Sequence, residues 1–572
     1  MPSPDRKDDT MFAILRSTFH LAAPYWRRSA GRHMAWLLAA LLVALVGIGT
    51  WLNVRVNEIN KLFYDALQHL DTPAFNDSMV QFFVVVGFLV AVMTLRAYIE
   101  QGLQIRWRQS LTDAMTARWL SGDTFYRIER DSLCDNPDQR LAQDINEYVR
   151  LMLSLGLGFI ANLGTLGSMG WILWQSAGPM RFDINGWALI IPGYLFWLAI
   201  GWGVLQTLAT HLAGHRLAAL TVEQQSCEAD YRFSLAKVRE ASEQIALYGG
   251  QGVEQGRLQR LFGEIQRNWL QLMRQNVYLN VTSTGFSVVA VLVPIIAVAP
   301  KVLSGELSMG TLMQDVSAFA ATTASVAWFA LSYSDLFQLS ARVRRLAGME
   351  AAMAASDGGC IELSRDPAAD AIEGDEVRLC LPTGRVLSKI DEFLFAPGER
   401  WLVRGPSGVG KSTLLRAIAG LWPFGDGRIS VPAGARVMFM PQKNYLADGP
   451  LKETLVYPSS LDDIGRDELV KVLEDCRLPH LVPRLDESAR WSHQLSPGEQ
   501  QRLAFARALL FKPDILFMDE ASAALDNDTE AHMYQLIVDR LPNCTIVSVA
   551  HRTTLEVFHD KHLNVSAAGA AA

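Results

Sequence analysis

Six apolar stretches in the first 340 residues constrain this 572-residue chain more than any other feature. They lie near residues 35–52, 80–95, 151–174, 187–208, 283–298 and 311–331. A helix needs roughly 20 apolar residues to cross the hydrocarbon core of a bilayer, and these stretches are close to that length and carry almost no charge. Buried helices of a large soluble protein are the alternative, but six such runs in one half of a chain fit it poorly. The sequence therefore predicts six membrane-spanning helices.

Basic residues are concentrated in two of the five loops between these stretches. Eight arginines lie between residues 96 and 150, and eight lysines or arginines lie between residues 216 and 274. The other three loops hold only Arg55 with Lys61, then Arg181, then Lys301. Cytoplasmic loops carry an excess of Lys and Arg. Both termini and the two basic loops are therefore predicted to face the cytoplasm.

The cysteines agree with this orientation. All six fall on the predicted cytoplasmic side, where thiols stay reduced: Cys134, Cys227, Cys360, Cys380, Cys476 and Cys544. No pair has C-x-x-C spacing, so the sequence gives no support for a zinc or redox site. It also shows no basic stripe with interleaved aromatics, so we expect no nucleic-acid partner.

The second half of the chain contains a phosphate-binding motif, G-x-x-x-x-G-K-[ST], at residues 405–412. In this motif, backbone N–H groups and a helix N-terminus converge on nucleotide phosphates. Lys411 would reach the β- and γ-phosphates, and Ser412 would hold Mg²⁺. A glycine-rich turn before a helix is the structural alternative. The residues predicted to bind ATP here are Gly405, Pro406, Ser407, Gly408, Val409, Gly410, Lys411, Ser412 and Thr413.

An apolar run at residues 515–518 ends in two acids, Asp519 and Glu520. A buried strand that stops at a carboxylate delivers the charge to the sheet edge where ligands of α/β proteins bind. Asp519 would bind Mg²⁺ directly or through water, and Glu520 would orient or deprotonate the attacking water. His551 follows another apolar run and Gln442 lies upstream, although either residue alone would be read as structural.

These motifs, in this order and with Leu495-Ser-Pro-Gly-Glu-Gln-Gln-Arg502 between them, resemble the ATPase domain of ABC transporters over about residues 360–565. The resemblance implies an α/β P-loop domain that hydrolyses ATP with Mg²⁺. It implies catalytic roles for Glu520 and His551, Mg²⁺ contacts for Ser412, Gln442 and Asp519, and contacts of Ser496, Gly498 and Glu499 with ATP held by a second copy of the chain. One membrane domain with one ATPase domain is half a transporter, so we expect a two-fold homodimer.

Other segments resemble particular subgroups of the ABC transporters. Gly420-Leu-Trp-Pro423, Tyr457-Pro458 and the glutamate at position 499 look like subfamily D of the ABC transporters. In the membrane half, residues 103–112, 228–233 and 299–314 are similar to the SbmA/BacA-like transporters. Members of that group with a fused ATPase move cobalamin, antimicrobial peptides, bleomycin-like compounds and other bulky hydrophilic solutes across the bacterial inner membrane. The resemblance implies an exporter-like membrane fold and a solute of this class.

Two positions depart from the common ABC pattern. Pro497 stands where glycine is usual and removes an N–H that could help to hold the γ-phosphate, although we expect activity to survive. Leu381 and Pro382 stand where an aromatic side chain often stacks on adenine. Base stacking contributes about 1–3 kcal/mol. The base is therefore expected to be held loosely, with poor selectivity for ATP over GTP.

The first basic loop contains the sequence Asn-Pro-Asp-Gln-Arg at residues 136–140. Asn-Pro is a turn signal, and the residues after proline can start a helix. A long cytoplasmic loop must contact something on the ATPase domain, so we expect a short cross-helix that transmits ATPase motion to the membrane. A capped helix without this role is the alternative. The predicted coupling residues are Asn136, Pro137, Asp138, Gln139 and Arg140.

Polar residues inside the predicted spans are few. Asn162 and the group at residues 322–325 would either line a water-filled cavity or serve helix packing. Gln314 and Asp315, near the outer end of the last span, indicate a gate or a substrate contact, or else a solvated helix end.

The expected organisation has five segments: a cytoplasmic N-terminal segment (1–30), a six-helix transmembrane domain with long helical cytoplasmic loops (31–345), a linker (346–360), an ABC nucleotide-binding domain (361–565) and a disordered tail (566–572). The expected function is ATP-driven transport, preferably import, of bulky hydrophilic solutes such as peptides or cobalamin-like compounds. An exporter of amphipathic drugs or lipid-like molecules, and an ATP-gated channel or signalling ATPase, are the alternatives. The expected partners are a second copy of the chain, membrane lipid and the solute.

Overall fold

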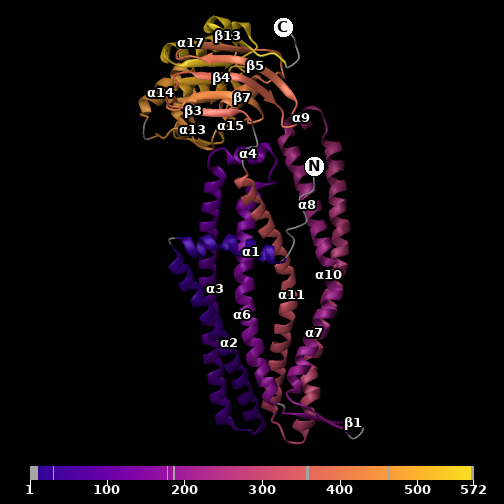
Figure 1. The fold of residues 1–572 in the computed structure, drawn as a ribbon. Helices are drawn as coiled ribbons and strands as arrows, with labels where there is room; N and C mark the ends of the chain where they lie inside the picture. The colour runs from indigo at the N-terminus through magenta and orange to yellow at the C-terminus, as the bar shows by residue number, and fades with distance from the viewer. Residues whose placement is uncertain are drawn as a thin grey trace. The chain divides into compact units, whose positions relative to one another are not determined.

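The computed structural model describes residues 11–29, 31–176, 178–184, 187–355, 360–461 and 464–567. The first ten residues of the expected N-terminal segment, residues 356–359 of the expected linker and residues 568–572 of the expected tail lie outside this description. The chain divides into two compact units, Met1–Met353 and Ala354–Ala572. Long helices build the first unit, and sheets with helices build the second (Figure 1). The predicted fold class is confirmed.

Among the described residues of the first unit, six helical segments are long and apolar enough to cross a membrane, as the sequence predicts. They are α2 (Arg32–Gln68), α3 (Thr72–Leu120), α5, η3 and α6 together (Pro137–Gln139, Arg140–Asp144 and Ile145–Ser176), α7 with α8 (Tyr194–Gly214 and Leu217–Glu240), α10 (Gln251–Leu303) and α11 (Met309–Ala354). At 1.5 Å per residue, the 53 residues of α10 extend about 80 Å, far beyond a hydrocarbon core of about 30 Å. The basic loops are therefore helical continuations of the membrane helices, and α11 runs on into the segment expected as a linker.

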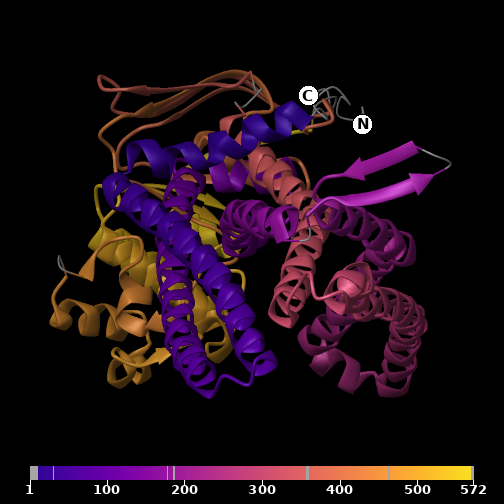
Figure 2. The same cartoon turned by 90° about the horizontal axis from the view of Figure 1, so that it is seen from below.

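The segment between the third and fourth membrane helices differs from the prediction. The fourth span was expected to start at residue 187, but β2 (Trp187–Ile191) pairs antiparallel with β1 (Met180–Ile184), and α7 starts only at Tyr194. The hairpin extends away from the helices (Figure 2). The sequence Asn185-Gly186 between the strands is a strong hairpin signal, and Pro192 separates the strand from the helix.

The N-terminal segment carries a helix that the sequence reasoning did not predict. Helix α1 (Met11–Ala23) and the π-helical turn η2 (Pro24–Arg28) precede α2, and α1 lies across α3 and α6 (Figure 1). The hydroxyl of Tyr148 on α6 donates to the carbonyl oxygen of Thr18 at 2.8 Å. Tyr25 stacks on Trp107 of α3 with ring centroids 5.9 Å apart. Aromatic packing therefore fixes this segment to the membrane helices.

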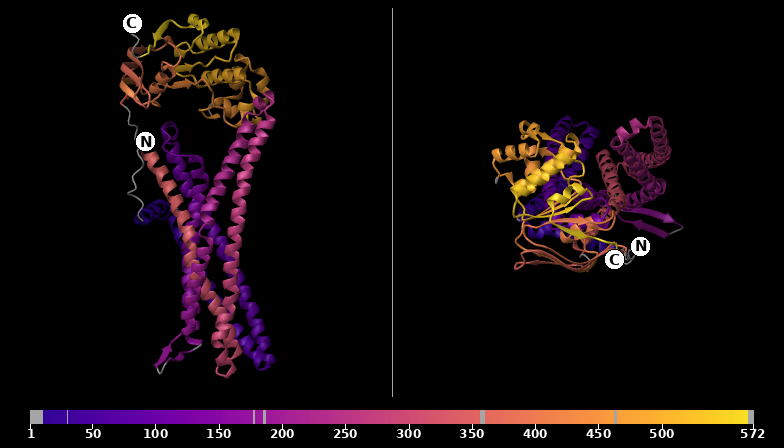
Figure 3. Two further views of the ribbon diagram at one scale, coloured as in Figure 1. Left: turned by 90° about the vertical axis from the view of Figure 1, so that its right-hand side faces the viewer. Right: turned by 90° about the horizontal axis from the view of Figure 1, so that it is seen from above.

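Helices α8 and α10 run alongside each other (Figure 3). The buried Asn268 of α10 donates through Nδ2 to the carbonyl oxygen of Leu220 at 2.9 Å and to Gln224 Oε1 at 3.0 Å. A short helix α9 (Ser242–Leu247) lies between them in the chain. The second basic loop is thus a helical hairpin held by a buried amide.

The first turns of α11 are packed against the other helices. Asp315 is 0% exposed and accepts a hydrogen bond from the Ser176 hydroxyl of α6. Asn57 Nδ2 of α2 donates to the carbonyl oxygen of Gln314 at 3.2 Å. The interpretation of Gln314 and Asp315 as a solvated helix end is therefore wrong.

The predicted polar residues deeper in the membrane helices lie within the bundle of this copy. Thr322, Thr323 and Ser325 of α11 are buried, and the hydroxyls of Thr323 and Ser325 donate to carbonyl oxygens of their own helix. Asn162 of α6 likewise donates to the carbonyl oxygen of Gly158 at 2.9 Å. These contacts favour helix packing over a cavity lining.

The described residues of the second unit form two larger sheets, a two-stranded pair of β9 (Gly449–Pro450) with β10 (Ser488–Ala489), and the helices around them. A fully parallel sheet has the order β13-β6-β12-β11-β8, and a mixed sheet has the order β3-β7-β4-β5. Phe517 of β11 stacks on Phe439 of β8 with ring centroids 4.7 Å apart, and both belong to the hydrophobic cluster between the sheets and α12. The strands are β3 (Glu362–Asp366), β4 (Ile372–Cys380), β5 (Val386–Phe395), β6 (Arg400–Arg404), β7 (Gly425–Pro432), β8 (Val437–Met440), β11 (Ile515–Asp519), β12 (Thr545–Val549) and β13 (Lys561–Asn564). The main helices are α12 (Lys411–Ile418), α14 (Arg466–Asp475), α16 (Pro497–Phe511) and α17 (Asn527–Arg540).

Gly310→Ala is expected to lower the melting temperature of the protein in detergent. A Cβ at this position would lie 2.1 Å from the carbonyl oxygen of Lys61 and 2.4 Å from Asp65 Oδ1. Because backbone atoms cannot move aside easily, we expect a destabilisation of about 1–3 kcal/mol. Gly167→Ala is the matched control, since a Cβ there meets no atom within 4 Å. Thermal unfolding of both variants can be monitored by tryptophan fluorescence. Equal melting temperatures of the two variants would contradict this account.

Candidate nucleotide-binding site

The parallel sheet brings four predicted site segments to one edge. β6 ends at Arg404, directly before the phosphate loop, and β11 ends at Asp519. β12 ends two residues before His551, and β8 ends two residues before Gln442. These four strands are neighbours and run parallel. Their carboxyl ends therefore share the edge where ligands of α/β sheets bind.

The phosphate loop requires glycine at its first position. Gly405 has φ +154°, and a Cβ there would lie 2.3 Å from the carbonyl oxygen of Val565. The loop then leads into α12, whose first turn holds Lys411, Ser412 and Thr413. Free N–H groups at a helix start attract anions. The loop and the helix together form a seat for phosphate.

Lys411 is bound to its own loop. Its Nζ donates to the carbonyl oxygens of Gly405 at 2.8 Å and Pro406 at 3.0 Å and lies 3.2 Å from His551 Nε2. Burial lowers the pKa of Lys411, while the carboxylates of Glu520 and Asp519 oppose this effect. A phosphate would give this buried ammonium an ionised partner in place of neutral carbonyls.

Ser412 and Asp519 form the part of the site that fits a metal. The Ser412 hydroxyl donates to Asp519 Oδ1 at 2.9 Å. Both offer hard oxygen ligands, which Mg²⁺ prefers, and Mg²⁺ typically takes one or two protein ligands together with phosphates and water. Among the described residues, no cluster of three or more His, Cys, Asp or Glu side chains could hold a metal ion. The residues present therefore fit Mg²⁺ that arrives with a nucleotide.

Glu520 has a strained backbone and two polar neighbours. Its φ is +48°, which is uncommon for a residue other than glycine and is typical of functional sites. Gln442 Nε2 donates to Glu520 Oε2 at 2.9 Å, and His551 Nε2 lies 3.6 Å from Oε1. Its side chain is 32% exposed, so water can reach the carboxylate. The structure thus brings Glu520, Gln442 and His551 together.

The predicted signature residues form a closed group at the start of α16. Ser496 is the N-cap; its hydroxyl donates to Glu499 Oε2 at 2.7 Å, and its backbone N–H donates to the same oxygen at 2.9 Å. His480 Nε2 lies 2.7 Å from Glu499 Oε1. Burial raises the pKa of Glu499, but the hydrogen bonds from Ser496 and His480 outweigh it and lower the pKa overall. The signature residues therefore hold one another within one copy.

Pro497 occupies the first helical position of α16. At this position the backbone N–H has no intrahelical partner, and the fixed φ of proline suits the helix. The departure from glycine therefore has a structural reason. The next residue, Gly498, lies close to the segment after Glu520, since a Cβ there would lie 3.3 Å from the carbonyl oxygen of Ala524.

The turn at Leu381 and Pro382 has no aromatic residue of its own, but an aromatic side chain from another part of the chain, Trp422, lies beside it. Leu381 N donates to the carbonyl oxygen of Arg385 at 2.8 Å, which closes the turn between β4 and β5. Trp422 Nε1 donates to the carbonyl oxygen of Cys380 at 2.9 Å. An indole is thus fixed directly before Leu381.

The predicted coupling residues divide into an exposed tip and a buried arginine. Asn136 has φ +44° and precedes the three-residue helix α5, and both Asn136 and Asp138 are exposed. Arg140 is buried and donates through Nη1 to the carbonyl oxygen of Arg345 at 2.5 Å. The sequence reasoning missed Asp144, a second residue of this segment that contacts α11. An acid at the start of an apolar helix indicates that the carboxylate has a partner, but the sequence does not identify that partner.

Both halves of the chain match known protein families. A family model described as ABC transporter transmembrane region 2 matches residues 29–303, and one described as ABC transporter matches residues 389–523. The chain is 32% identical over 558 residues to an uncharacterized ABC transporter ATP-binding protein of Synechocystis, covering 94% of this chain and 81% of that protein. It is 29% identical over 567 residues to the inner membrane ABC transporter ATP-binding protein YddA of Escherichia coli, covering 98% and 99%.

Two further similarities concern more distant proteins. The lysosomal cobalamin transporter ABCD4 of Homo sapiens is 26% identical over 583 residues, covering 93% of this chain and 92% of that protein. The structure of a bacterial Atm1-family ABC exporter with ATP bound matches with a TM-score of 0.73 at 17% identity, covering 94% of both chains. At this identity, the structural match shows a shared fold.

Pro497→Gly is expected to lower the stability of the second unit and to leave ATP hydrolysis nearly unchanged. Glycine enlarges the conformational freedom of the unfolded chain, which costs about 0.4–1 kcal/mol, whereas the capping box of Ser496 and Glu499 remains. Thermal unfolding and the steady-state rate of ATP hydrolysis measure the two effects. A loss of hydrolysis of about tenfold or more, equivalent to about 1.4 kcal/mol, would show that the proline itself supports the reaction.

Proposed function

Since the chain belongs to the ABC transporter family, we propose that two copies form a transporter that imports bulky hydrophilic solutes, such as peptides or cobalamin-like compounds. ATP hydrolysis coupled to transport is the activity of this family, and the membrane and ATPase domains are fused in one chain. The observation that carries the proposal is the cluster of Lys411, Ser412, Asp519, Glu520 and His551 at one sheet edge.

The cluster supports a division of roles during hydrolysis. Lys411 would bind the β- and γ-phosphates, and Ser412 and Asp519 would hold Mg²⁺, which neutralises charge on the phosphates when bound. Glu520 would orient or deprotonate the attacking water. His551, within 3.6 Å of Glu520, would contact the γ-phosphate. Gln442, already bonded to Glu520, would also contact Mg²⁺ and link it to the membrane helices.

The dimer is proposed because this cluster is half of an ABC site. Ser496 and Glu499 bond to each other, and Glu499 also contacts His480. These contacts do not involve the phosphate loop of the same copy. In a two-fold dimer, Ser496, Gly498 and Glu499 would face the ATP on the loop of the second copy. The Ser496 hydroxyl would then exchange its bond to Glu499 for a phosphate oxygen. ATP binding would close the pair, and hydrolysis would reopen it.

The substrate class and the direction rest on narrower similarities. The motifs at residues 103–112, 228–233 and 299–314 support the SbmA/BacA-like grouping. A lysosomal cobalamin transporter is similar over nearly the whole chain. The E. coli relative is named as an inner membrane protein, and the basic loops favour cytoplasmic termini. We therefore propose import across a bacterial inner membrane, with membrane lipid around the helices.

Glu520→Gln is expected to abolish turnover and to preserve ATP binding. Removing a general base costs about 10²–10⁴ in rate, whereas the phosphate contacts of Lys411 and Ser412 remain. The ATPase rate and the dissociation constant for ATP, measured on purified protein with Mg²⁺, test both parts. Glu474→Gln, which changes an exposed acid of α14, is the control. Undiminished hydrolysis in Glu520→Gln would remove this residue from its proposed role.

ATP-driven solute movement in inside-out vesicles tests the direction. These vesicles expose the cytoplasmic face to added ATP, so an importer should release preloaded labelled cobalamin or peptide into the medium. Vesicles that contain Glu520→Gln provide the matched control. Accumulation inside the vesicles would show an exporter. Solute flow that persists in Glu520→Gln would show an ATP-gated channel.

A further inference from the structure

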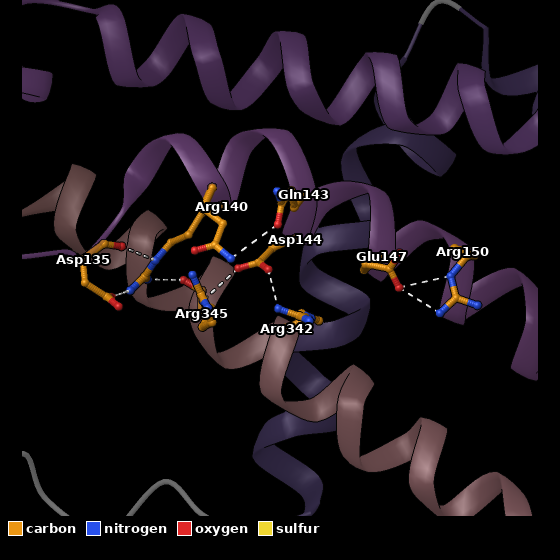
Figure 4. Close-up of polar contacts among 9 residues, drawn as sticks. Asp135, Arg140, Gln143, Asp144, Glu147, Arg150, Arg342 and Arg345 are labelled. Atoms are coloured by element: carbon orange, nitrogen blue, oxygen red, sulfur yellow. Dashed lines mark hydrogen bonds and ion pairs between the residues drawn. The ribbon is translucent and has the colours of Figure 1, made fainter. Parts of the chain in front are cut away.

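A buried carboxylate ties the third membrane helix to the last one (Figure 4). Asp144, the final residue of η3, is 0% exposed. Arg342 Nη1 of α11 donates to Asp144 Oδ1 at 2.7 Å. Arg345 Nε, one helical turn further on, lies 2.8 Å from Asp144 Oδ2. One acid thus contacts two basic residues of α11, of which the first, Arg342, is 198 positions away in the chain.

Arg140 reinforces this connection from the other end of η3. It donates through Nη1 to the carbonyl oxygen of Arg345 at 2.5 Å and through Nε to that of Asp135 at 3.0 Å. Its guanidinium also pairs with the Asp135 carboxylate, and Figure 4 shows these side chains converging on α11. This hydrogen bond and ion pair with Arg140 lower the pKa of Asp135, although burial opposes them. The predicted coupling segment is therefore fixed to α11 through both the main chain and the side chains.

Further contacts tie the end of α11 to the same loop. Arg118 at the end of α3 lies 3.0 Å from Glu350. Arg127 of α4 (Thr124–Arg130) donates through Nη2 to the carbonyl oxygen of Met353 at 3.1 Å. The second unit starts at Ala354, and its first strand β3 at Glu362. The part of α11 that leads directly into the ATPase unit is thus held by residues 118–144.

The ion pair is a poor device for stability alone. Removing a carboxylate from water costs several kcal/mol, and well-packed apolar residues at such positions are often as stable or more stable. The two arginines also contact Asp144 differently. Arg342 makes a hydrogen bond, whereas Arg345 Nε and Asp144 Oδ2 lie close together as an ion pair but have no hydrogen-bond partner among the described residues. Directional pairing of this kind is well suited to fixing the register of two helices.

We propose that Asp144 is a positioning residue for transport, which clamps the coupling segment at residues 136–140 to α11. This inference rests on the proposed ATP-driven transport and on the coupling role predicted for that segment from the sequence. The ATPase unit would act on the membrane helices at two places, through the covalent end of α11 and through the exposed tip at Asn136. With the clamp intact, both places move as one body. Without it, ATP would still be hydrolysed, because the hydrolytic cluster consists of residues of the second unit.

The test compares Asp144→Asn with Glu147→Gln. Glu147 lies one turn further along α6 and pairs with Arg150 at 2.8 Å on an exposed surface, so its variant removes an ion pair of the same helix without touching the clamp. Asp144→Asn is expected to keep the ATPase activity and to lower labelled cobalamin moved per ATP by about tenfold or more. Glu147→Gln is expected to match the wild type in both measurements.

Hydrogen–deuterium exchange makes the test independent of the solute. Trapping the wild type with ATP and vanadate should change exchange in residues 136–144 and 342–353 together. In Asp144→Asn, only one of the two segments should respond. A response of both segments, as in the wild type, would overturn the clamp. A wild type in which neither segment responds would instead contradict the proposed ATP-driven function.

Two variants separate positioning from folding. Arg342→Gln leaves Arg345 beside the carboxylate, so no buried acid is left unpaired, and it should show the same uncoupling in milder form. Asp144→Glu keeps the charge and should restore part of the coupling. If ATPase activity and transport fall in equal proportion in Asp144→Asn and Arg342→Gln, the role of Asp144 is structural and the proposal is wrong.

Discussion

Backbone hydrogen bonding in lipid is the constraint on which the rest of the molecule depends. A bilayer core offers no water to N–H and C=O groups, so a crossing segment must satisfy them within its own helix. The crossing helices therefore stay continuous, and α3, α10 and α11 run for 49, 53 and 46 residues. Their ends lie outside the hydrocarbon as stiff extensions. A chain built in this way can carry a displacement along a helix without a flexible loop to absorb it.

Local patterns in the sequence could predict most of the spans and which residues gather at the carboxyl edge of the parallel sheet. Residues 405–412 and Asp519 follow strands whose parallel pairing brings their ends together, so linear motifs were sufficient. The hairpin at residues 180–191 was missed because the apolar run was weighed above the turn signal Asn185-Gly186. The contact of Asp144 with Arg342 could not be predicted, because one sequence does not reveal which residues 198 positions apart will meet.

The basic residues of the membrane unit have two physical roles. As charges near apolar runs they bias the orientation of the chain. This was the meaning available from the sequence for all of them except Arg140, which was also predicted to be a coupling residue. In the structure, Arg140 and Arg342 are also specific hydrogen-bond donors to one loop and one carboxylate. Both roles depend on arginine remaining charged, but only the second depends on its geometry. Lysine could replace arginine in the first role more readily than in the second.

The capping box of Ser496 and Glu499 has a consequence for the timing of the cycle. A hydroxyl that is already satisfied within its own helix gains little when it turns to a phosphate, because one hydrogen bond replaces another and the net gain of a typical hydrogen bond is about 0.5–1.5 kcal/mol. The closed dimer would therefore be only slightly favoured at this contact. A closed dimer that is only slightly favoured would reopen quickly, which suits a transporter that must open again on every turnover.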